Sequence, residues 1–165
     1  VAHNEPSEVY IAGLRGLILV APATPTPLAL PADALSSFAT VYDTRESIEG
    51  ALENMLVSRP LPHDLHEQVV ADSLAGAPGA KAGWPLVMSQ EDISGELAGI
   101  RVPVLVIAGG ADKVDPVEAH KSELLPRLAD AEFHVLPGIG HLVPLQAPAE
   151  VAGLVSAFLE KRIYA

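Results

Sequence analysis

Two residues in the second half of the sequence have the types and the setting needed for acid–base chemistry. Asp112 follows the apolar run 102–108 and the pair Gly109-Gly110, and His141 ends the turn sequence PGIGH. A carboxylate that accepts a hydrogen bond from an imidazole fixes the tautomer of the ring and stabilises its protonated form. Asp112 and His141 are therefore candidates for the acid and the general base of a Ser-His-Asp triad.

Other polar residues offer competing interpretations. Asp115 could be the acid instead, but it precedes a proline and fits the N-cap of the following helix. His63 and His66 stand three apart on a predicted helix, but two histidines supply too few ligands for a metal site. A solvated helix face is the preferred interpretation, and no metal is predicted. Two further histidines are interpreted as structural: His120 and His134.

The composition narrows the classes of function. The chain has 165 residues, of which 49% are hydrophobic and 4% aromatic, so one domain with an aliphatic core is expected. A net charge of −11 argues against nucleic acid or an anionic membrane surface as a partner. The absence of cysteine excludes disulfides and thiolate chemistry. Without an apolar span of ~18 residues or a signal-peptide layout, we expect a cytoplasmic protein.

Three short apolar segments are predicted to be strands, and they are separated by helical patterns. Continuous apolar runs of this length favour parallel strands that are buried on both faces. After the second strand, helices are predicted over 116–128 and 148–161. The expected strands cover residues 14–20, 102–108 and 131–136.

The segment between the first two strands has helical patterns only, from about residue 32 to residue 98. Asp43 and Glu46 fit a capping box at the start of one helix. The Gly/Ala/Pro-rich stretch 76–85 predicts a break, and a short helix is expected over 90–98. One helical face is expected to carry Leu65, Val69 and Leu74. Three residues either line an apolar pocket or pack in the core of this segment: Met55, Trp84 and Met88.

This order of elements predicts an α/β fold. Strands that alternate with helices form a parallel sheet with right-handed crossovers. Ligands of such sheets bind beyond the carboxyl ends of the strands. The loops that carry Asp112 and His141 both leave strands at that edge, so we expect the two side chains to meet there.

Three stretches of the sequence resemble the α/β-hydrolase superfamily. The stretch LRGLILVAP resembles its sixth strand, PVLVIAGGADKVDP its seventh strand with the acid loop, and LPGIGHLVPLQAPAEVAGLVSAFL its last strand, histidine loop and terminal helix. The resemblance implies that Asp112 is the triad acid and His141 the general base. It also implies a partial α/β-hydrolase fold, a three-stranded parallel sheet with flanking helices. Residues 1–27 and 96–165 would form part of the core, and 28–95 a helical cap.

The nucleophile of that family is missing from the sequence. It sits in a G-x-S-x-G elbow, and no serine here lies between glycines at that spacing. The resemblance places the elbow and the oxyanion donors before the first residue, so we expect a truncated, C-terminal portion of a hydrolase. No cofactor is implied, and the expected reaction is hydrolysis of an ester or related acyl bond in a small apolar or mixed substrate.

Two alternatives from other classes stay open. The chain could be a catalytically silent fragment that binds a partner or associates with itself, because the strand at 14–20 would have an unpaired edge. It could also use the His–Asp pair alone in chemistry that needs no cofactor.

Overall fold

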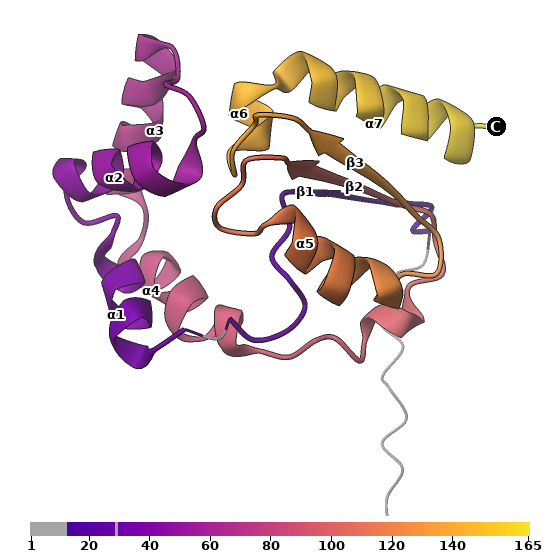
Figure 1. Ribbon diagram of the computed structural model, residues 1–165, viewed down its shortest axis with the longest axis horizontal. Helices are drawn as coiled ribbons and strands as arrows, with labels where there is room; N and C mark the ends of the chain where they lie inside the picture. Colours follow the sequence, from indigo (N-terminus) through magenta and orange to yellow (C-terminus); the bar gives the residue numbers. More distant parts are fainter. Residues whose placement is uncertain (1–12, 29) are drawn as a thin grey trace, which may run out of the picture.

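A parallel sheet of three strands forms the centre of the molecule (Figure 1). The structure, a computed structural model, describes residues 13–28 and 30–165. The sheet order β1-β2-β3 confirms the predicted α/β class. The irregular lead-in expected over 1–12 lies outside the described residues. The strands are β1 Leu17–Val20, β2 Val104–Gly109 and β3 Ala131–Leu136.

The central strand β2 is the most deeply buried element. All six of its residues are buried, as its apolar composition predicts, whereas the four apolar residues of β1 are each only partly buried. Val20 pairs with Ile107, and Gly109 pairs with Leu136, so β2 and β3 end at the same level of the sheet. This register brings the loops that follow β2 and β3 together at one edge.

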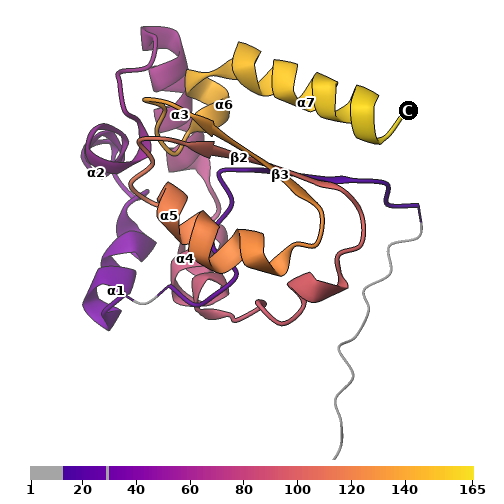
Figure 2. The same cartoon turned by 45° about the vertical axis from the view of Figure 1, so that its right-hand side comes forward.

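Helices cover both faces of the sheet (Figures 1 and 2). On one face, Leu105 and Ile107 of β2 pack against Phe158 of the last helix. On the other face, Val104 and Val106 pack against a helical stretch between β2 and β3. These helical segments are α5 Val117–Ala119, η4 His120–Leu124, η5 Leu125–Arg127, α6 Val143–Gln146 and α7 Pro148–Arg162.

The segment predicted as one helix over 116–128 is irregular. It changes from α through a π-helical turn to a 3-10 turn, in which Pro126 interrupts the chain of amide donors. The helix begins at Val117 with Pro116 as its N-cap, so the N-cap role expected for Asp115 is wrong. Asp115 is instead buried at the loop that precedes the helix.

The chain between β1 and β2 contains only helices and loops within the described residues, as predicted. We call α1 to α4 the helical insert; it lies beyond the carboxyl ends of β2 and β3 (Figure 1). Its core contains Ile48, Leu52 and Val70. The elements of this region are α1 Ala32–Thr40, α2 Arg45–Ala51, η1 Leu52–Leu56, α3 His63–Ala75, α4 Pro78–Leu86, η2 Met88–Gln90 and η3 Leu97–Gly99.

The capping box of α2 differs from the predicted one by one residue. Thr44, and not Asp43, is the N-cap, and its hydroxyl accepts from the Ser47 amide at 3.1 Å. In return, the Ser47 hydroxyl accepts a hydrogen bond from the Thr44 amide at 3.3 Å, so Glu46 is not part of the box. Either register satisfies free amides at the start of the helix, which is why spacing alone did not separate them.

Three other expectations for the insert are wrong in detail. The predicted break over 76–85 is mostly helix α4, because Pro78 occupies a first-turn position that needs no amide donor. The helix expected over 90–98 is replaced by two separate 3-10 turns, η2 and η3. In α3 the buried residue is Val70, and Leu74 is exposed. Within the described residues, every helix is too short or too polar to cross a bilayer.

Candidate active site

The loops after β2 and β3 approach each other backbone to backbone. A Cβ atom at Gly109 would lie 2.2 Å from the carbonyl oxygen of Gly140 and 2.5 Å from that of Ile139. The Ala111 amide donates to the Ile139 carbonyl at 2.8 Å. The φ of Gly109 is not positive, so the close approach of the two backbones, and not a left-handed turn, requires glycine there. Gly138, with φ of +70°, provides the left-handed turn of the second loop.

These loops bring Asp112 and His141 into contact. The Asp112 Oδ2 atom lies 2.9 Å from His141 Nδ1, and the Asp112 side chain has no exposed surface. Its Oδ1 atom accepts from the amides of Val114 at 2.8 Å and Asp115 at 3.0 Å, which fixes the plane of the carboxylate. Because an ionised carboxylate only accepts, Nδ1 carries the proton and Nε2 keeps a free lone pair.

Each member of the pair stabilises the charged form of the other. Burial alone would raise the pKa of Asp112, but the hydrogen bond from His141 and the amides of Val114 and Asp115 lower it overall. Burial would lower the pKa of His141, but the hydrogen bond to Asp112 and the charges of Asp112 and Asp115 raise it above its ordinary value. The imidazolium is therefore favoured at this position, as a general base needs after it has taken a proton.

Asp115, the competing acid, lies farther from the ring. Its Oδ2 atom is 3.9 Å from His141 Nδ1, beyond hydrogen-bonding distance, whereas Asp112 is in contact. Burial raises the pKa of Asp115, and the charge of Asp112 raises it further. The geometry therefore favours Asp112 as the orienting acid.

Gln146 connects the histidine loop to the helical insert. Its Oε1 atom accepts from the amides of Gly140 at 2.8 Å and Ser58 at 3.3 Å. Its Nε2 atom donates to the Ser58 hydroxyl and to the Arg59 carbonyl, each at 3.2 Å. The Ser58 hydroxyl in turn donates to the Gly138 carbonyl at 2.6 Å. Sequence reasoning missed Gln146 because its partners Ser58 and Arg59 lie 88 and 87 positions away.

The two histidines expected to be structural are placed differently. His120 is fully buried, and its Nε2 atom donates to the Pro22 carbonyl at 2.8 Å, which ties η4 to the loop after β1. Among the described residues, its Nδ1 atom has no partner. His134 lies in β3, where it pairs with Ile107.

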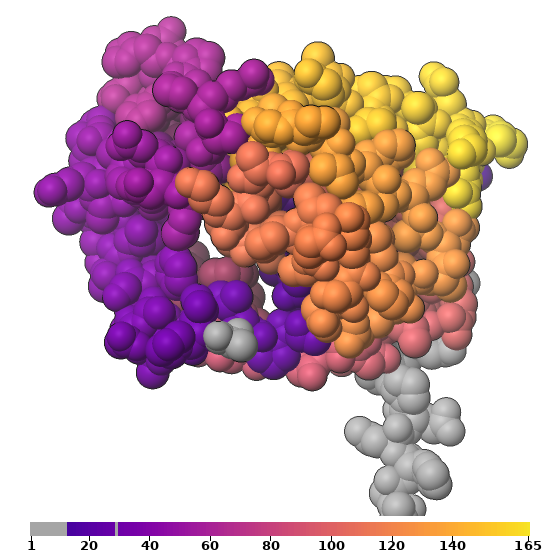
Figure 3. Space-filling view, in the orientation of Figure 1, coloured from indigo at the N-terminus to yellow at the C-terminus, as the bar shows by residue number. Residues whose placement is uncertain are grey.

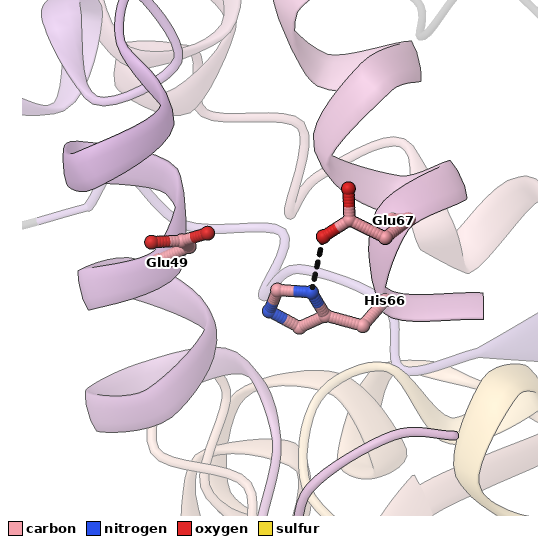
Figure 4. Close-up of side chains that lie close together, drawn as sticks. All are labelled: Glu49, His66 and Glu67. Atoms are coloured by element: carbon pink, nitrogen blue, oxygen red, sulfur yellow. Dashed lines mark ion pairs between the residues drawn. The ribbon is translucent and has the colours of Figure 1, made fainter. Parts of the chain in front are cut away.

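A group of possible metal ligands lies between α2 and α3 (Figure 4). Ligand atoms of Glu49, His66 and Glu67 lie within 4.8 Å of one another, and His63, which stands three residues before His66, is not part of this group. The Arg45 guanidinium already donates to Glu49 at 3.0 Å and to both carboxylate oxygens of Glu67 at 3.0 and 2.9 Å. An ion-pair network accounts for this cluster, so it gives no evidence for a metal centre.

Two cavities lie beside the helical insert. The larger, of about 520 Å³, is lined by residues of α2, η1, α3 and the loop 57–61, and by no residue of the acid or histidine loops. The smaller, of about 320 Å³, includes Val114 and Asp115 of the acid loop. Trp84 and Met88 line it, which agrees with the pocket interpretation, whereas Met55 packs in the core of the insert. Figure 3 shows the surface hollowed between the insert and α5.

The fold and the site together define an α/β protein with a carboxylate–imidazole pair at the carboxyl edge of a parallel sheet. The chain belongs to the alpha/beta hydrolase family, whose model matches residues 2–154. A comparison with functionally curated proteins gave no significant match.

Solved structures with the same fold include three named as enzymes. An esterase from Exiguobacterium antarcticum is 18% identical, with a TM-score of 0.77 over 88% of this chain and 57% of that one. An enol-lactonase from Burkholderia xenovorans LB400 is 16% identical, with a TM-score of 0.71 over 90% and 57%. A hydrolase from Pseudomonas aeruginosa PA01 is 24% identical, with a TM-score of 0.69 over 88% and 55%. The chain therefore spans little more than half of the structures it resembles.

Proposed function

We propose that this chain supplies the general base His141 and its orienting acid Asp112 for hydrolysis of an ester or related acyl bond. The nucleophile would be a serine outside these 165 residues, because no serine here stands in a G-x-S-x-G elbow. The observation that carries the proposal is the contact of 2.9 Å between His141 Nδ1 and the buried Asp112 Oδ2. Membership of the hydrolase family supports the reaction class.

The geometry supports a defined sequence of proton transfers. His141 Nε2 takes the proton of the serine hydroxyl while the serine oxygen attacks the acyl carbon. Asp112 stabilises the imidazolium, which then gives the proton to the leaving oxygen as the ester bond breaks. A water molecule, deprotonated by the same Nε2 atom, attacks the acyl-enzyme, and the proton returns to the serine oxygen.

We further propose that residues 28–95 act as a cap over the substrate. The helical insert lies beyond the strand ends where Asp112 and His141 meet, and Trp84 and Met88 line the cavity that reaches Asp115. Its apolar side chains suit a small apolar or mixed substrate.

The proposal is tested by assaying p-nitrophenyl acetate with two proteins: the 165-residue chain and the product of the complete open reading frame that encodes it. The chain alone is expected to lack triad-like activity, because it has no nucleophile. The longer product, if it brings a G-x-S-x-G serine, should hydrolyse the ester. In that product Asp112→Asn should lower kcat by about 10⁴ and His141→Ala by about 10⁶, with Glu118→Gln as an exposed control.

Two results would contradict the proposal. One is an ester-hydrolysing 165-residue chain whose activity depends on His141, since no outside serine would then be needed. The other is a serine-containing longer product whose kcat does not respond to His141→Ala.

Association through β1 is the second candidate function. Within the described part of the chain, β1 pairs only with β2, and its four apolar residues are all partly exposed. An apolar strand with one unpaired edge favours pairing with a further strand.

A further inference from the structure

The cavity beside the acid loop combines apolar walls with negative charge. It lies between the loop 23–28, the segment 84–93 and the residues Val114 and Asp115. Its apolar wall includes Leu28, Trp84, Met88 and Ile93. Glu91 and Asp115 are its charged residues, and the described residues that line it include no lysine, arginine or histidine.

The apolar wall is incompletely covered by the chain itself. Five large hydrophobic residues between Trp84 and Ile93 are exposed, with Met88 at 53% and Ile93 at 45% of their full surface. Exposed apolar patches on a folded protein mark sites that bind an apolar partner or ligand. Trp84, Met88 and Ile93 all belong both to this patch and to the cavity wall.

Asp115 is a buried carboxylate that has no cationic partner in hydrogen-bonding contact within the part of the chain that the structure describes. Its side chain is 9% exposed, and His141 Nδ1 lies 3.9 Å away but already donates to Asp112 at 2.9 Å. The charged or titratable groups around it are Asp112, His120 and His141. Burying an ionised carboxylate is costly unless a cation or further donors compensate it. The carboxylate therefore keeps acceptor capacity toward the cavity.

We propose that this cavity selects substrates that carry an ammonium group on an apolar body, with the ammonium at Asp115 and the body against Trp84, Met88 and Ile93. The inference rests on the proposed function, because it names the substrate class of the same site. A carboxylate-bearing substrate would instead meet two like charges, those of Asp115 and Glu91. The net charge of −11 adds a long-range attraction for cations.

The test uses binding to the 165-residue chain, so it does not depend on turnover. Trp84 is the single tryptophan and lines the cavity, so its fluorescence reports occupancy directly. The probes share a phenyl body: 2-phenylethylammonium, the neutral 2-phenylethanol and the anionic 3-phenylpropanoate. At neutral pH and low salt, the cation should bind at least tenfold more tightly than the alcohol, and the anion most weakly.

Variants assign the preference to one carboxylate. Asp115→Asn should weaken binding of the cation at least tenfold and change that of the alcohol less than twofold, whereas Asp115→Glu should keep the preference. Glu118→Gln removes an exposed carboxylate outside the cavity and should change neither. Circular dichroism and a urea midpoint verify that each variant is folded.

Three results would overturn the inference: no binding of any probe, equal binding of cation and alcohol, or a preference that survives in folded Asp115→Asn. Cation binding that depends on Asp115, together with a complete product that hydrolyses no ester, would sustain the inference and reject the proposed function.

Discussion

At the scale of single residues, the site depends on the separate hydrogen bonds that the two carboxylate oxygens of Asp112 accept. Both amides that bind Asp112 Oδ1 come from its own loop, at Val114 and Asp115, so its own loop orients the carboxylate independently of His141. Oδ2 is then free to accept from the imidazole at 2.9 Å. The same contact raises the pKa of His141 and lowers that of Asp112.

These shifts predict the pH dependence of folding. A raised His141 pKa stabilises the fold at low pH, and this contribution is lost as the pH rises through the pKa of the folded state. A lowered Asp112 pKa stabilises the fold at any pH above the pKa that this carboxyl has in the unfolded chain. This contribution is lost as the pH falls through the pKa of the folded state. Asp112→Asn should therefore cost more stability at about pH 5, between the two ordinary values of ~4 and ~6.5, than at pH 9.

Urea unfolding at the two pH values measures this difference, and NMR titration should show the His141 pKa falling in Asp112→Asn. An equal loss of stability at pH 5 and pH 9 would mean that the pair is not ionised in the folded state. In an active complete product, activity should rise with pH through the raised His141 pKa, because the neutral ring is the base.

Gly140 is the residue where the histidine loop tolerates no side chain. A Cβ atom there would lie 2.8 Å from the Ser58 amide nitrogen and 2.9 Å from the Leu56 carbonyl oxygen, both backbone atoms. Gly140→Ala should cost about 2 kcal/mol or more by overpacking. Gly153→Ala in α7, where nothing lies within 4 Å, should instead stabilise by up to ~1 kcal/mol. Equal effects of the two changes in thermal melts would contradict the close contact.

At the scale of elements, the insert and the sheet are joined at the residues that hold His141. The side-chain oxygen of Gln146 accepts hydrogen bonds from Gly140 of the histidine loop and from Ser58 of the insert. The Arg59 side chain also donates to the backbone carbonyl of Gln146 at 2.9 Å. The Leu142 amide adds a bond to the Leu56 carbonyl at 3.1 Å. The position of the histidine loop is therefore coupled to that of the insert.

Gln146→Leu preserves the volume of the side chain but removes these hydrogen bonds. It leaves the amide of Gly140 and the carbonyl of Arg59 without this partner, which should destabilise the fold by about 2–3 kcal/mol. Gln68→Leu removes an exposed bond within α3 and should cost less than ~0.5 kcal/mol. Chemical denaturation of both variants makes the comparison, and similar losses would show that Gln146 has no special structural role.

At the scale of the whole molecule, the strands of the sheet differ in how deeply they are buried. β2 is covered on both faces and paired on both edges, whereas β1 is apolar but only partly buried and forms one edge. This chain covers only 55 to 57% of the matched structures. A further strand, from another copy or from a longer product, would bury this edge.

We therefore expect the 165-residue chain to self-associate as its concentration rises, which analytical ultracentrifugation measures. Leu14 is 44% exposed and lies three residues before the start of β1, so Leu14→Lys should weaken association about tenfold or more by placing a charge near the edge. Leu74→Lys, at a residue 40% exposed on α3, serves as the control and should have no effect. A monomer at all concentrations would reject association through β1.

The sequence by itself determined the α/β class, the three parallel strands, the helical insert and the two loops that meet at the strand ends. It could do so because apolar runs and their alternation with helices are local signals, and because parallel strands place their following loops at one edge. Helix boundaries were not determined by the sequence. The α2 cap moved by one residue because either capping register satisfies free amides, and α4 forms because Pro78 stands in its first turn.

Only the tertiary structure decided which carboxylate contacts His141, since Asp112 and Asp115 differ by three positions and are separated by burial and hydrogen bonds. It also revealed Gln146 as the connection to the insert, and Asp115 as a wall of the cavity. Contacts between residues nearly ninety positions apart leave no periodic trace in the sequence, because they depend on how whole elements pack.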